Sequence, residues 1–150
     1  MPSKSTVEQA REDLREGKSP TTAAGEFVHE EIEHVRHGKH GARSPQQAIA
    51  IGLSKARRAG IPLKPPAPGR AKAKTRQRAE RDYRRGQAKT KTKTSARRSR
   101  ARERALKREP RNTVSHKALS QQARRAAQRG KPSARKQRAR GHAASTRKAA

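Results

Sequence analysis

The stretch SPQQAIAIGLSKARRAGIP, residues 44–62, contains the clearest structural element of this chain. Ser44 suits the N-cap position of a helix, Pro45 suits its first turn, and Gln47 is placed to complete a capping box. The closing Gly-Ile-Pro, residues 60–62, is typical of a helix end, because glycine adopts the left-handed conformation and proline cannot continue the helix. The sequence therefore predicts a helix with a defined beginning and end.

The two faces of this helix differ in polarity. At 100° per residue the apolar face is wide, and such a width predicts contact with two other helices and a central place in the fold. Its members are Ala48, Ile49, Gly52, Leu53 and Ala56, extended on one side by Ile51. The opposite, solvent-facing side is predicted to hold Gln46, Gln47, Ser54, Arg57 and Arg58.

Two further helices are predicted before this one. The first covers about residues 6–16, with Ser5 as its N-cap in a capping box, and the second covers about residues 23–37, with Thr22 as its N-cap. A glycine follows each of them, as expected for a C-terminal stop. The three helices are expected to form a small head at residues 5–60.

Polar residues in the second predicted helix need an interpretation. Glu31 falls among the apolar positions, and we interpret it as a boundary carboxylate that pairs with a nearby arginine. His34, His37 and His40 are spaced by three, which favours either interaction with the dipole at the helix C-terminus or metal ligation. Because no carboxylate or cysteine stands at an obvious fourth position, no metal and no other cofactor is predicted.

The remaining chain differs from the head in composition. Residues 61–150 carry 31 Lys and Arg against four acids, whereas residues 1–60 carry ten against eight. Of the 14 Leu, Ile, Val and Phe residues, eleven lie within residues 7–63, so any core is expected in the head. The predicted fold is all-α: the head, a proline-rich linker at 61–72, and a disordered cationic tail at 73–150. Three stretches of the tail are helix-prone once their charge is neutralised, at about 73–85, 96–108 and 115–129.

The charge of the tail predicts its partner. Lys and Arg that neutralise phosphates release condensed counterions, so a polyanion is expected to bind. Aromatic residues for base stacking are nearly absent, with only Phe27 and Tyr83 in the chain, which favours the backbone of duplex DNA over single strands. The predicted contacts are Arg57, Arg58, Arg70, Lys72, Lys74, Arg76, Arg84, Arg85, Lys89, Lys91, Lys93, Arg97, Arg98, Arg100, Arg102, Arg124, Arg125, Arg135, Lys136 and Arg138.

We therefore expect low-specificity, electrostatic binding of duplex DNA by a nucleoid-associated or histone-like protein of the bacterial cytoplasm, with possible self-association through the head. Two alternatives are an RNA- or ribosome-associated protein and a polybasic adaptor for an acidic protein or membrane surface. No catalytic constellation is visible, so an enzyme is not expected. With no cysteine, the chain has neither a disulfide framework nor a thiolate nucleophile. No apolar run of the length of a membrane span is present.

Residues 43–63 carry a resemblance. ARSPQQAIAIGLSKARRAGI is similar to the shared helix of a family of small basic bacterial proteins, with the pattern (Lys/Arg/Ser)-x-x-Gln-Ala-Ile-Ala-Ile-(Ala/Gly)-Leu-Ser-x-Ala-Arg. The preceding EFVHEEIEHVRHGKHG matches more loosely. Members are sometimes labelled DNA-binding or plasmid-stabilisation proteins, and this resemblance implies the same kind of role without assigning residues to it. The tail also resembles a linker-histone or histone-like tail in composition, although here Arg outnumbers Lys.

Overall fold

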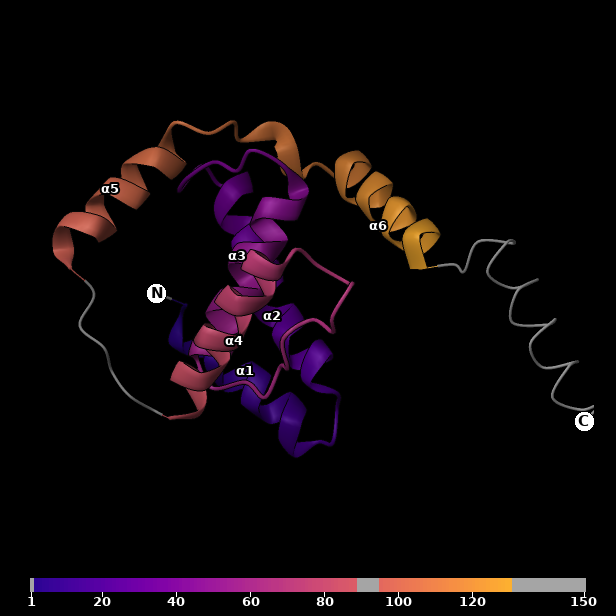
Figure 1. Cartoon of the computed structure of the whole chain (residues 1–150). Helices are drawn as coiled ribbons and strands as arrows, with labels where there is room; N and C mark the ends of the chain where they lie inside the picture. Colours follow the sequence, from indigo (N-terminus) through magenta and orange to yellow (C-terminus); the bar gives the residue numbers. More distant parts are fainter. Residues whose placement is uncertain (1, 89–94, 131–150) are drawn as a thin grey trace, which may run out of the picture. The chain divides into compact units, whose positions relative to one another are not determined.

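The structure is a computed structural model that describes residues 2–88 and 95–130, the last two by their backbone alone. All regular elements in these two ranges are helices (Figure 1), which confirms the all-α class. The chain divides into a compact unit that ends at Ser115 and a second unit that begins at His116. The elements are α1 (Lys4–Arg15), α2 (Pro20–Arg36), α3 (Pro45–Arg58), α4 (Ala73–Gln87), α5 (Ala96–Lys107), the 3-10 helix η1 (Asn112–Val114) and α6 (His116–Gly130).

The beginning of α3 follows the predicted cap closely. Ser44 is the N-cap, and the backbone N–H of Gln47 donates a hydrogen bond to its Oγ at 3.3 Å. In a capping box the Gln47 side chain would accept from the backbone N–H of Ser44, but here its Oε1 accepts from the N–H of the preceding residue, Arg43, at 2.8 Å. At the other end Gly60 has φ +93°, the left-handed conformation predicted for the helix stop.

The caps of the first two helices lie two and three residues before the predicted ones, respectively. Ser3, not Ser5, is the N-cap of α1, and its Oγ accepts from the backbone N–H of Thr6 at 3.1 Å. Ser19, not Thr22, is the N-cap of α2, and it accepts from the N–H of Thr22 at 3.2 Å. The proline after Ser19 explains the second difference, because its fixed φ suits the first helical position.

The main core lies where α1, α2 and α3 meet the turn that follows α3. α3 contacts α2, α4 and η1, in agreement with its predicted central place. α3 and α2 approach each other closely at Gly52, where a Cβ would lie 2.7 Å from the Cα of Val28. The buried members of this core are Ala10, Ala23, Ala24, Phe27, Ala56, Ile61 and Leu63.

A second cluster of buried residues includes one residue of the predicted tail. Val114 of η1 is fully buried against Val35, Ala42 and Ala48. The loop before α3 is held by backbone hydrogen bonds, from Gly41 N–H to the carbonyl of Leu106 and from Ala42 N–H to that of Pro110, both 2.9 Å. The expectation that every core residue lies in the head was therefore wrong, because a single valine far along the chain completes this cluster.

α4 also belongs to the compact unit, because it packs against α3. At Gly86 the two backbones meet so closely that a Cβ would lie 1.8 Å from the carbonyl oxygen of Arg57. The side chain of Gln87 donates a hydrogen bond to the carbonyl of Gly60 at 3.2 Å, and Ala79 is buried on the same helix.

The compact unit thus continues well beyond the predicted end of the head at residue 60. The start of the proline-rich segment 61–72 is part of the core rather than a free linker, since Ile61 and Leu63 are both buried. Helices occupy all three stretches that the sequence marked as helix-prone. The expected disorder of residues 89–94 and 131–150 lies outside the described residues.

Candidate nucleic-acid interface

α5 is the most cationic helix that the structure describes. It carries six basic residues and one acid over twelve positions, and none of its residues is buried. The acid, Glu103, forms an ion pair with Lys107 at 2.9 Å, and this contact lowers the pKa of its carboxyl group. A shallow groove follows one side of the helix, lined by Arg97, Ala101, Arg104, Ala105 and Arg108. The small alanines between the arginines leave this side of the helix open.

α4 presents its basic side chains from a fixed support. Ala79 and Gly86 face the protein, while most of the basic residues are exposed. Arg84 forms an ion pair with Glu80 one turn earlier, so part of the charge of this helix is already neutralised. Because the helix is held against α3, the backbone positions of its arginines are fixed.

Most of the predicted contact residues that the structure describes are exposed, six lie outside the described residues, and Arg57 is buried. Exposed on the described surface are Arg58, Arg70, Lys72, Lys74, Arg84, Arg85, Arg97, Arg98, Arg100, Arg102, Arg124 and Arg125, and Arg76 is half-buried. Arg124 and Arg125 lie on α6, which belongs to the second unit. Outside the described residues are Lys89, Lys91, Lys93, Arg135, Lys136 and Arg138.

Arg57 is a correction. It was placed on the solvent-facing side of α3, but its exposed fraction is only 7%. Its Nε donates a hydrogen bond to the carbonyl of Leu63 at 3.2 Å, and burial lowers the pKa of the guanidinium. The segment after α3 folds back over the helix, and this return was not visible in the periodicity of α3 alone. Arg57 is therefore part of the packing between α3 and its neighbours.

Several exposed basic residues were missed by the sequence analysis. Arg104 and Arg108 lie beside Arg97 in the groove of α5, and Arg81 lies on the exposed side of α4. The signal that identifies the first two is their spacing, since residues seven and eleven positions after Arg97 share its helical face. Counting charge along the tail treats all positions alike and does not reveal this arrangement.

A second arrangement of polar side chains lies between α2 and the loop that follows it. Glu31 is fully buried, and its partners are Lys55 and His40 instead of the expected arginine. His34 joins this group, whereas His37 is largely exposed and contacts Glu33. Burial lowers the pKa of His34, which favours its neutral form.

Comparison with known proteins gives no further assignment. No family model matches the chain, no curated protein matches it, and no solved structure matches it. The resemblance noted for residues 43–63 therefore stays a prediction. Within the described ranges, none of the helices combines the length and apolar character needed to cross a bilayer.

Proposed function

We propose that this protein binds duplex DNA with low sequence specificity and acts as a histone-like protein that coats or compacts the bacterial nucleoid. The observation that carries the proposal is α5, where six basic residues against one acid surround a helix with no buried side. Such a helix is stabilised by a polyanion, because bound phosphates neutralise the arginines and so remove the repulsion between them.

The ordered state of the cationic helices supports tight electrostatic binding. Fixing the backbone of a residue costs about 1–2 kcal/mol of conformational entropy, so a tail that folds on DNA would lose much of its binding energy. α4 is already packed on α3, and its basic residues need no such ordering. An α-helix also fits the major groove, which is about 12 Å wide in B-form DNA.

The shortage of aromatic side chains favours duplex over single-stranded partners. Phe27 is fully buried in the main core, and Tyr83 on α4 is the only other aromatic residue of the chain. Proteins that bind single strands stack bases on several such rings. Duplex RNA, the main competitor, offers phosphates in A-form geometry, so its relative affinity is the quantity to measure.

The test compares two variants of equal net charge. In the first, Arg97, Arg98 and Arg100 on α5 are changed to Gln; in the second, Lys4, Arg11 and Arg15 on α1 are changed to Gln. If each of the α5 residues meets one phosphate, the slope of log K against log[salt] becomes shallower by about 2.7 in the first variant. The second variant keeps the wild-type slope.

Fluorescence anisotropy with labelled duplex DNA at several salt concentrations measures these slopes, and competition with duplex RNA of equal length ranks the two partners. Equal slopes for the two variants, whether both are shallower than the wild-type slope or both match it, would remove α5 as the interface. A clear preference for duplex RNA would contradict DNA binding and would indicate that the same surface binds RNA.

A further inference from the structure

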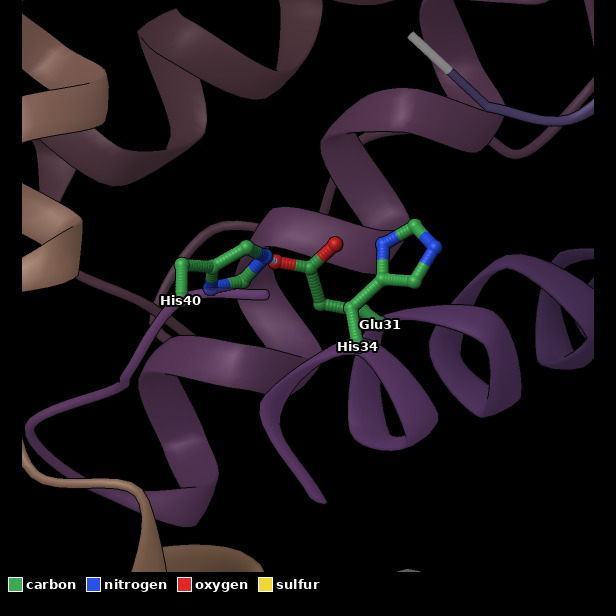
Figure 2. A group of neighbouring side chains, drawn as sticks. All are labelled: Glu31, His34 and His40. Atoms are coloured by element: carbon green, nitrogen blue, oxygen red, sulfur yellow. Dashed lines mark ion pairs between the residues drawn. The ribbon is translucent and has the colours of Figure 1, made fainter. Parts of the chain in front are cut away.

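A metal site can be built from three side chains that the proposed function does not use. Glu31 comes from the buried side of α2, His34 follows one turn later, and His40 lies in the loop after the helix. One ligand atom from each lies within 4.8 Å of the other two. Figure 2 shows the carboxylate of Glu31 between the two imidazole rings. We propose that Glu31, His34 and His40 bind a divalent transition metal ion of the Zn²⁺ type.

One oxygen atom of the Glu31 carboxylate is available to bind a metal on the side of the two rings. Lys55 binds Oε2 of Glu31, which leaves Oε1 directed at the histidines. Oε1 lies 3.2 Å from Nε2 of His40, which is an ion pair only when the ring is protonated, and it accepts no hydrogen bond from any described residue although it is buried. Buried polar atoms normally have a partner, and a metal ion would supply it.

The outer nitrogen of each ring lies near an oxygen acceptor, within hydrogen-bond distance for His40 but not for His34. A ligating histidine generally donates its second N–H to a carbonyl or carboxylate, which fixes the tautomer. Nδ1 of His40 lies 3.1 Å from the carbonyl of Gly41, so Nε2, which faces Oε1 of Glu31, is the nitrogen that would bind a metal. Nε2 of His34 lies 3.7 Å from Oε1 of Glu30, and Figure 2 shows its Nδ1 on the side of the Glu31 carboxylate.

The size and chemistry of the group suit zinc. Ligand atoms around tetrahedral Zn²⁺, with bonds of about 2.0–2.1 Å, lie roughly 3.3 Å apart, so the three side chains need to close by about 1.5 Å at most. Two imidazoles and one carboxylate are a donor set that zinc uses, with the fourth position open to water. His34 and His40 are 19% and 15% exposed, which provides a path for the ion. Lys55 keeps its contact with the other carboxylate oxygen and lowers the affinity by charge repulsion.

The site would act as a clamp between α2 and the loop that carries His40. The next two residues of this loop, Gly41 and Ala42, bind the carbonyls of Leu106 and Pro110. Metal binding is therefore expected to stabilise both the loop and the segment docked on it. It requires no nucleic acid, so its success or failure is independent of the proposed function.

The experiment uses the full chain freed of nucleic acid, because phosphates also bind metal ions. Isothermal titration with Zn²⁺ should show one saturable site, and His34→Ala and His40→Ala should each weaken it by more than about 100-fold, since even the loss of an outer-shell partner costs 10–100-fold. The control is His37→Ala, which removes a neighbouring exposed histidine and should leave the affinity unchanged.

X-ray absorption of the zinc-loaded wild-type protein gives a readout that does not depend on the folding of any variant. It should show a shell of nitrogen and oxygen at about 2.0 Å with the outer scattering of two imidazoles. The proposal is overturned if the wild-type protein shows no saturable site, if His37→Ala weakens binding as much as the other two changes, or if the spectrum lacks imidazole.

Discussion

The docking of α4 on α3 makes a prediction in which two known effects have opposite signs. Gly86→Ala adds one methyl group to α4. In a free helix this change is favourable by up to about 1 kcal/mol, because alanine has the higher helix propensity. In the docked helix the methyl group would lie 1.8 Å from the carbonyl oxygen of Arg57 and 3.1 Å from the N–H nitrogen of Gly60.

Both contacts are with backbone atoms, so no side-chain rotation relieves them. α4 has to move by about 1.6 Å or more to restore ordinary contact, and this movement strains the hydrogen bond from Gln87 to Gly60. Overpacking of this kind costs about 1–3 kcal/mol. After subtraction of the propensity gain, we expect a net loss of up to about 2 kcal/mol, or a fall in Tm of up to roughly 10 °C for a domain of about 100 residues.

Thermal unfolding of the full chain followed by circular dichroism measures the sign of the change. The control is Gly25→Ala in the middle of α2, where an added Cβ meets nothing within 4 Å, and this variant should become slightly more stable. Hydrogen exchange should show faster exchange of the α4 amides in Gly86→Ala only. An increase in Tm for Gly86→Ala equal to that of Gly25→Ala would refute the docking of α4.

Two further predictions concern the rest of the compact unit. Gly41→Ala places a methyl group 1.8 Å from the backbone carbonyl oxygen of Glu109, so it should detach the segment around residues 106–114, seen as loss of hydrogen-exchange protection there while the α1 amides keep theirs. Lys55→Met leaves the carboxylate of Glu31 buried without the Lys55 ammonium group and should lower the free energy of unfolding, measured with urea, by about 3 kcal/mol. Most of this loss should be regained in the double variant with Glu31→Gln. If the effects of the two changes simply add, the two residues do not interact.

The elements that local sequence specifies were predicted well. The helix class and the α3 boundaries follow from signals within a few residues of each helix end, as at Ser44 and Gly60. The N-caps of α1 and α2 were misplaced by two and three residues because serine and threonine stand at several neighbouring positions, and all of them are acceptable caps. The position of Pro20 was the local signal that selects Ser19.

The candidate sites were predicted less completely. The basic character of the interface is a property of composition, so it was evident before any folding. Its geometry was not, because Arg57 is covered by residues that follow α3, whereas Arg104 and Arg108 share a groove with Arg97. For the histidines, spacing by three suggested His34, His37 and His40 as a set. In the structure His37 is largely exposed and pairs with Glu33, and the third member of the group is Glu31.

The chain alone thus determines that the protein is helical, strongly cationic after residue 60, and poor in aromatic residues for stacking. Only the tertiary structure decides how far the folded unit extends. α4 and η1 join it through Gly86, Ala79 and Val114, which are too small or too isolated to form an apolar stripe. Where two backbones pack against each other at a glycine, the contact needs no repeating pattern of apolar residues in the sequence. This packing can therefore be recognised only in the tertiary structure.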